Sequence, residues 1–162
     1  MKIISVLVGV FVLLACRSGN DKRILAIKTL PSFKMTSLVD GSCINSNQIP
    51  SGKPIVFFYY DPECDHCKLE AAMLGRHLDE LKAASIYMVT QRDSVAEIRQ
   101  FASACQLDRR VNISFVRDSN YSFFGLFLPS ALPFMAIYDR EKKLRRIFIG
   151  EVDVPSIAYS LD

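Results

Sequence analysis

The chain has 162 residues, 50% of them hydrophobic, and its 20 Lys and Arg residues nearly balance 17 Asp and Glu residues. This length is sufficient for one domain with a hydrophobic core. The near balance of charge gives no electrostatic basis for nucleic-acid binding, which requires a basic surface. We therefore expect a single globular domain that does not bind nucleic acid.

The N-terminus has the pattern of a secretory signal. Met1 and Lys2 precede an apolar stretch over 3–14, which is shorter than the roughly 20 residues needed to span a bilayer. Cys16 follows directly and makes the segment resemble a bacterial lipoprotein signal, in which this cysteine carries the lipid. We predict a signal peptide over 1–15 and a polar tether over 16–28. The alternative is an ordinary signal peptide with an unmodified Cys16; both imply export to a compartment that permits disulfides.

Strand and helix patterns alternate along the first half of the remaining chain. Asp40-Gly41 separates two short strand patterns, which predicts a hairpin over 33–45. The continuous apolar run Ile55–Tyr60 predicts a strand buried on both faces. A helix is expected over 64–83, because its apolar residues recur every three or four positions: Cys67, Ala71, Leu74, Leu78 and Leu81.

The second half continues the alternation. Strands are expected over 85–90 and 112–116, with a helix between them that Ser94 caps. Its inward residues should be Val95, Ile98, Ala102 and Cys105. An irregular aromatic stretch over 121–128 precedes a hairpin of 134–138 with 144–149, and Asp153 begins a last short helix. The order predicts an α/β fold: a mixed central sheet flanked by helices, with an added N-terminal β-hairpin.

A Cys-x-x-Cys pair, Cys64 and Cys67, lies where the buried strand gives way to a helix. The helix N-terminus favours a thiolate on Cys64, and Cys67 one turn later can close a disulfide. A zinc site would need a second such pair, and haem attachment would need histidine where Lys68 stands. A purely structural disulfide is the remaining alternative. The placement favours a redox pair without metal or cofactor.

Glu70 follows Cys67 by three positions and precedes Leu74 by four, so it lies along the apolar face of the helix. Desolvation there would raise its pKa and allow it to exchange a proton with Cys67. The alternative is a glutamate turned to solvent or paired with Lys53 or Lys82.

His66 lies between the two cysteines, where a partly charged imidazole would favour the Cys64 thiolate. Asp65 opposes this effect. A solvated histidine without influence on the thiols is the alternative.

These features together resemble the thioredoxin-like thiol–disulfide oxidoreductases tethered to the bacterial envelope, the TlpA/ResA group, from about Thr29 to the C-terminus. The domain is accordingly expected over 29–162. The segments that carry the resemblance are Phe33–Gly41, Gly52-Lys53-Pro54, the CxxCxxE pattern of Cys64 to Glu70, Leu132-Pro133, and Asp139 with Lys143-Leu144 and Gly150.

The resemblance implies that Pro133 is cis and lies against the cysteine pair, with the backbone of Leu132 free to bind substrate. It also implies a catalytic role for Glu70. The expected partners are protein thiols and disulfides and a membrane electron donor. The expected protein is a periplasm-facing reductant, anchored by lipid.

The chain departs from the related proteins at three positions. Glu63 stands where tryptophan is common, Phe58 stands where thioredoxin has a buried acid, and Leu132 stands where threonine or valine is common. A peroxiredoxin-like peroxidase is an alternative function, although it would need threonine where Asp61 stands. A non-catalytic binding module is another. The sequence leaves the state of Cys43 and Cys105 open.

Overall fold

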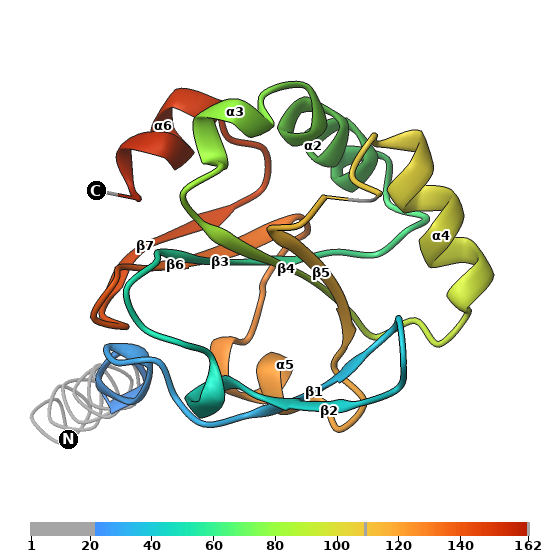
Figure 1. The fold of residues 1–162 in the computed structure, drawn as a ribbon. Helices are drawn as coiled ribbons and strands as arrows, with labels where there is room; N and C mark the ends of the chain where they lie inside the picture. Colours follow the sequence, from blue (N-terminus) through green and yellow to red (C-terminus); the bar gives the residue numbers. More distant parts are fainter. Residues whose placement is uncertain (1–21, 109, 162) are drawn as a thin grey trace, which may run out of the picture.

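A mixed β-sheet organises the part of the protein that the computed structural model describes, residues 22–108 and 110–161. Its seven strands within these residues lie in the order β2-β1-β5-β4-β3-β6-β7 (Figure 1). They are β1 (Lys34–Ser37), β2 (Cys43–Asn45), β3 (Ile55–Tyr59), β4 (Ser85–Thr90), β5 (Ile113–Arg117), β6 (Phe134–Tyr138) and β7 (Leu144–Ile149). The β3–β4 and β4–β5 pairs are parallel, and the other pairs are antiparallel. The predicted fold class is confirmed.

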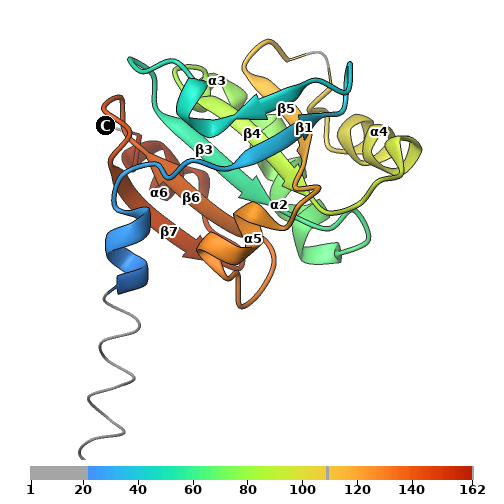
Figure 2. The same ribbon diagram turned by 90° about the horizontal axis from the view of Figure 1, so that it is seen from below.

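Helices cover both faces of the sheet. One layer contains α2 (Asp65–Arg76), α3 (Leu78–Leu81), α4 (Val95–Ala104) and α6 (Val154–Tyr159), above the sheet in Figure 1. The view from below in Figure 2 brings α5 (Ser122–Phe127), which lies on the opposite face, to the front. A short 3-10 helix, η1 (Ser46–Gln48), follows the N-terminal hairpin.

The central strand β3 explains how the two layers are held together. Every residue of β3 is buried, and successive side chains point to opposite faces of a strand. Val56 and Phe58 therefore enter the core beneath α2, α4 and α6, whereas Ile55, Phe57 and Tyr59 enter the core beside α5 and the hairpin. The uninterrupted apolar run expected from the sequence thus serves two separate cores.

The helix expected over 64–83 is divided into α2 and α3. His77 interrupts it with backbone angles of φ −118° and ψ 25°. Gly75, a weak helix former, lies just before the break, and a Cβ added there would lie 2.0 Å from the carbonyl oxygen of Cys105. This glycine therefore allows the end of α4 to approach α2 closely.

Two further expectations need correction. The aromatic stretch expected to be irregular forms α5, because the Asp118 carboxylate accepts hydrogen bonds from the N–H groups of Phe123 and Phe124, each at 3.0 Å. Val95, expected to point inward, is 38% exposed, whereas Ile98, Ala102 and Cys105 are buried as expected. Val95 occupies the first turn of α4, at the edge of the buried face.

The N-terminal end of the described chain contacts the domain. Residues 22–27 are helical, and Ile27 is buried. The Tyr138 hydroxyl donates a 2.9 Å hydrogen bond to the carbonyl oxygen of Ile27. The C-terminal end of the segment predicted as a tether thus contacts the domain through Ile27. Cys16 and residues 1–15 lie outside the described residues. Among residues 22–108 and 110–161, no helix has the length and hydrophobicity needed to cross a membrane.

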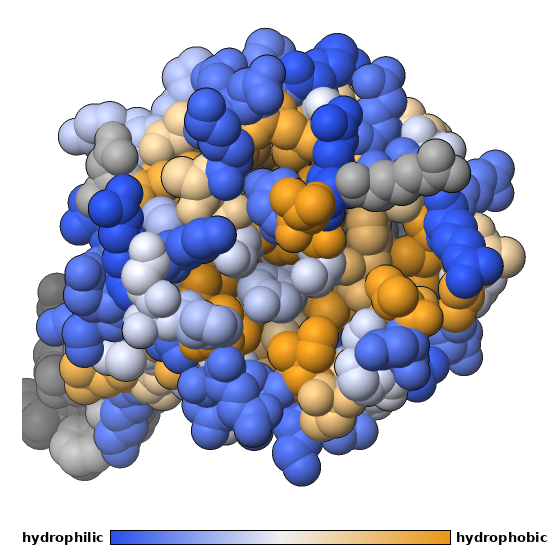
Figure 3. Space-filling view, in the orientation of Figure 1, coloured by the Kyte–Doolittle hydropathy of each residue, from blue (hydrophilic) through white to orange (hydrophobic). Residues whose placement is uncertain are grey.

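Figure 3 shows hydrophobic side chains gathered on one face of the molecule, within a hydrophilic margin. A groove of about 660 Å³ lies between the hairpin tip and α4. Its apolar lining includes Val39, Val95, Ile98 and Phe115, and none of the predicted site residues contributes to it.

Candidate active site

Cys64 is the residue that caps the N-terminus of α2. The strand β3 ends at Tyr59, and the backbone turns over the next residues, where the N–H of Cys64 donates to the carbonyl oxygen of Asp61 at 3.1 Å. The Sγ atom of Cys64 then accepts a hydrogen bond from the N–H of Cys67 at 3.3 Å. A helix N-terminus supplies unpaired N–H groups and partial positive charge, which stabilise a thiolate. The half-exposed Cys64 has the position of an attacking thiol.

Cys67 lies one turn inside α2 and is fully buried. Burial raises the pKa of the Cys67 thiol above its ordinary value, and its hydrogen bond to the Cys64 sulfur adds to this effect. Burial thus opposes ionisation of the Cys67 thiol. Both cysteines are free in this structure.

Glu70 lies on the buried face of α2 and is only 1% exposed. Its Oε2 accepts a hydrogen bond from the N–H of Val152 at 3.2 Å, while Oε1 has no partner among the described residues. Burial is the main reason that the pKa of Glu70 rises from about 4.5 to about 7, and the charges of Glu151 and Asp153 add to it. The glutamate is thus neither turned to solvent nor paired with a lysine.

His66 faces solvent, with 72% of its side chain exposed. Its Nδ1 lies 2.5 Å from Oε1 of Glu151, in the segment between β7 and α6. The sequence did not indicate this carboxylate partner, because it lies 85 positions away.

Leu132 and Pro133 immediately precede β6, and the bond between them is cis. Pro133 is buried, and its carbonyl oxygen accepts a hydrogen bond from Gly150 at 2.8 Å. Leu132 is half-buried and contacts both hydrophobic cores. Its backbone N–H and C=O make no hydrogen bond to any described residue, so they remain available to an extended chain.

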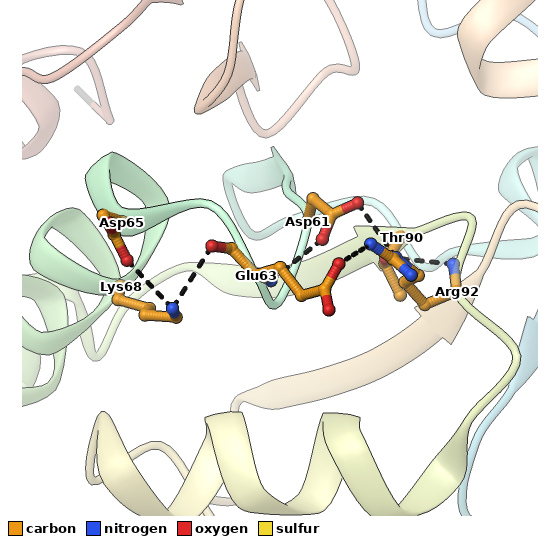
Figure 4. A network of polar contacts seen from close by, with 6 residues as sticks. All are labelled: Asp61, Glu63, Asp65, Lys68, Thr90 and Arg92. Atoms are coloured by element: carbon orange, nitrogen blue, oxygen red, sulfur yellow. Dashed lines mark hydrogen bonds and ion pairs between the residues drawn. The ribbon is translucent and has the colours of Figure 1, made fainter.

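A charged network surrounds the turn before Cys64 (Figure 4). Arg92 Nε donates to Oδ2 of Asp61 at 3.0 Å, and Nη2 of Arg92 forms an ion pair with Glu63. Lys68 Nζ donates to the carbonyl oxygen of Glu63 at 3.2 Å and to Oδ1 of Asp65 at 3.0 Å. Sequence reasoning missed Arg92, which lies 31 positions after Asp61 and belongs to no recognisable motif.

The other cysteines do not join this site by a disulfide. Cys43 is exposed on β2, and Cys105 is buried after α4; both are free. The Cys105 thiol donates to the carbonyl oxygen of Lys68 at 3.7 Å, and burial raises its pKa to about 11. Within residues 22–108 and 110–161, no group of three or more His, Cys, Asp and Glu side chains is arranged to hold a metal ion.

Comparison with known proteins supports the fold and identifies the family. The sequence profile of the AhpC/TSA family matches residues 27–148, whereas the curated proteins contain no significant match.

Three solved structures illustrate the structural likeness. A secreted Mycobacterium tuberculosis disulfide oxidoreductase homologous to Escherichia coli DsbE is 18% identical, with a TM-score of 0.65 over 79% of this chain and 92% of that one. StoA from Bacillus subtilis is 14% identical, with a TM-score of 0.62 over 82% and 98%. A thioredoxin-like protein from Aeropyrum pernix is 16% identical, with a TM-score of 0.64 over 91% and 99%. At these identities the likeness establishes a thioredoxin-like fold.

Proposed function

The chain belongs to the AhpC/TSA family, and from this premise we propose that it is a thiol–disulfide oxidoreductase that acts on protein cysteines through Cys64 and Cys67. One observation carries the proposal. A half-exposed thiol caps α2 by accepting the backbone N–H of Cys67, and the thiol of Cys67 is itself buried one turn inside the helix. Such a pair can form a mixed disulfide at the outer sulfur and release it at the inner one.

The exchange assigns a different task to each thiol. The Cys64 thiolate attacks a substrate disulfide, forms a mixed disulfide and releases the first substrate thiolate, which takes up a proton. Cys67 then loses its proton and attacks Cys64 Sγ, which releases the second substrate thiolate. The result is an oxidised Cys64–Cys67 disulfide and a reduced substrate. Because burial opposes ionisation of Cys67, this second step needs a nearby proton acceptor.

Glu70 is the proposed acceptor. Its carboxyl group lies on the buried face of α2 that carries Cys67, and its pKa of about 7 lets it change protonation state near neutral pH. A group poised near the operating pH is suited to general acid–base catalysis. The backbone of Leu132 beside cis-Pro133 is the proposed contact for the substrate chain.

The proposed location is the bacterial envelope, with the domain facing the periplasm and a lipid on Cys16. This proposal rests on the sequence of residues 1–16 and accords with the secretion of the structurally similar mycobacterial oxidoreductase. Reductive action, fed by a membrane electron donor, is proposed from the resemblance to the TlpA/ResA group.

A peroxidase activity is the second candidate, favoured by the family match alone. Partial burial opposes ionisation of Asp61, but hydrogen bonds from Arg92 and from the Glu63 N–H outweigh it and hold the pKa of the carboxyl below its usual value. An ionised carboxylate can only accept hydrogen bonds, unlike a hydroxyl group. Asp61 therefore cannot donate a hydrogen bond to a peroxide bound beside Cys64.

Two assays with the purified protein test these functions against each other. The proposed oxidoreductase reduces insulin disulfides in the presence of dithiothreitol, and Cys64→Ser abolishes this activity. Consumption of hydrogen peroxide without insulin reduction would instead establish the peroxidase. Absence of both activities would favour a binding module.

A further inference from the structure

Arg92 contacts both acidic side chains of the turn that precedes Cys64 (Figure 4). It binds Asp61 through Nε at 3.0 Å and Glu63 through Nη2. The forked guanidinium group has several donors in fixed directions, so it can join two carboxylates at once. Lysine, with a single ammonium group, cannot reproduce this geometry.

The parallel strands β3 and β4 bring Arg92 to the turn. Tyr59 and Val89 are register partners near the ends of these strands, so the segments that follow begin side by side. The Arg92 N–H donates to Oγ1 of Thr90 at 3.2 Å, and Thr90 is fully buried. The backbone of Arg92 is thus fixed by a buried residue at the end of β4.

The turn itself depends on Asp61. Its Oδ1 accepts the Glu63 N–H at 2.9 Å, and its carbonyl oxygen accepts the Cys64 N–H at 3.1 Å. Since Arg92 binds the other carboxylate oxygen, Oδ2, it holds this turn without competing for Oδ1. Arg92 therefore acts on Cys64 through Asp61, which contacts both residues.

Several residues close to Cys64 in the sequence carry charged side chains. Asp61, Glu63 and Asp65 are acidic, and negative charge beside a thiol disfavours its thiolate. Lys68 offsets Asp65 at 3.0 Å, which leaves Arg92 as the cation paired with Asp61 and Glu63.

Two other ionisable side chains of α2, His66 and Glu70, make their contacts elsewhere. His66 contacts Glu151, and Glu70 is buried with its Oε2 bonded to the Val152 backbone. Neither contact offsets the two carboxylates of the turn.

We propose that Arg92 is a positioning residue that keeps Cys64 reactive by offsetting the charges of Asp61 and Glu63 in the turn that presents the thiol. The inference rests on the proposed function in giving Cys64 the role of attacking thiol. Arg92 itself touches neither the sulfur nor a substrate; it acts through the two carboxylates.

The test measures alkylation of the reduced full-length protein with limiting iodoacetamide at neutral pH, quantified at each cysteine by peptide mass spectrometry. Cys43, exposed on β2, serves as the internal reference. We expect Arg92→Gln to lower the Cys64/Cys43 labelling ratio by about threefold to tenfold, as suits partly exposed charges. Arg99→Gln, which removes an exposed arginine of α4, should leave the ratio unchanged.

Charge removal then separates the proposed effect from mere damage to the fold. Adding Asp61→Asn and Glu63→Gln to Arg92→Gln should restore the ratio, because asparagine retains the acceptor for the turn and both negative charges are gone. Glu63→Gln alone should raise the labelling ratio by roughly twofold. It removes one negative charge from the turn, and the charge of Arg92 then offsets that of Asp61 alone. This variant leaves Arg92 in place and stays informative even where Arg92→Gln does not fold.

Three results would each overturn the inference. The first is an unchanged labelling ratio in Arg92→Gln, and the second is a triple variant whose ratio is as low as that of Arg92→Gln. The third is an unchanged or lower ratio in Glu63→Gln. Alkylation requires no turnover, so a protein that fails to reduce insulin but shows these ratios refutes the proposed function and leaves the role of Arg92 intact. The reverse pattern refutes the role of Arg92 alone.

Discussion

The backbone N–H of Val152 donates a hydrogen bond of 3.2 Å to Oε2 of Glu70 and so joins α2 to the segment between β7 and α6. This bond holds the carboxyl group in place inside the core. It only partly offsets the cost of burying a charge there, and the pKa of Glu70 accordingly rises to about 7.

Glu70→Gln should slow disulfide exchange near neutral pH while preserving the fold. Glutamine keeps the shape of the side chain but cannot accept the proton of Cys67. We expect a loss of roughly tenfold to a hundredfold, the lower range of general acid–base effects. Stopped-flow rates between pH 5 and pH 9 should diverge most near the pKa of Glu70, at about 7. Superimposable pH–rate profiles would contradict the proposed role.

Glu70 should also make the free energy of unfolding fall as pH rises. Its pKa is about 4.5 ordinarily and about 7 in the folded protein, so between these values the folded state holds a proton that the unfolded chain has released. Proton linkage then lowers the free energy of unfolding across this window, by roughly 3 kcal/mol at most. Urea denaturation of the reduced protein at pH 4.5 to 8 measures this, and Glu70→Gln should show a shallower decline than the wild type.

The two cysteines should give opposite results on substitution. Cys64→Ser should abolish exchange, because the half-exposed thiol is gone. Cys67→Ser should retain attack and accumulate a covalent mixed disulfide through Cys64, since no inner thiol can release it. Non-reducing electrophoresis with a model substrate detects this adduct. Faster alkylation at Cys67 than at Cys64 under limiting reagent would reverse the assignment.

Asp118→Ala should destabilise the domain by about 2 kcal/mol or more, because the carboxylate of the buried Asp118 accepts the Phe123 and Phe124 N–H groups at the start of α5. Chemical denaturation gives the change in the free energy of unfolding. Asp93→Ala removes an exposed aspartate and should change stability little. Equal effects of both substitutions would show that the Asp118 contacts do not stabilise α5.

Cys16→Ala should yield a protein without lipid. The expectation comes from the apolar segment and the cysteine that follows it, and Cys16 lies outside the described residues. Mass spectrometry of the membrane-extracted wild type should find the lipid on an N-terminal Cys16. A mature chain with an unmodified Cys16 would refute the anchor.

Local patterns in the sequence determined the elements that carry the cysteines. The apolar run at 55–60 predicted the central strand, and the three- and four-residue spacing of apolar side chains placed Cys67 and Glu70 on the buried face of α2. Such features depend on backbone periodicity and burial, which neighbouring residues express directly. The cis bond at Pro133 was expected from the family resemblance, and the structure confirms it.

Only the tertiary structure brought together residues that are distant along the chain. The order of strands in the sheet places Arg92 beside Asp61 and Glu63, and the segment after β7 brings Glu151 to His66 and Val152 to Glu70. Two local expectations also failed. The Asp118 carboxylate accepts the N–H groups of Phe123 and Phe124, five and six positions later, and so begins α5 within the aromatic stretch. The long helix divides at His77, just after Gly75, where α4 meets α2. The contacts of Arg92, Glu151 and Val152, by contrast, depend on which strands become neighbours, and no periodicity within a segment encodes that choice.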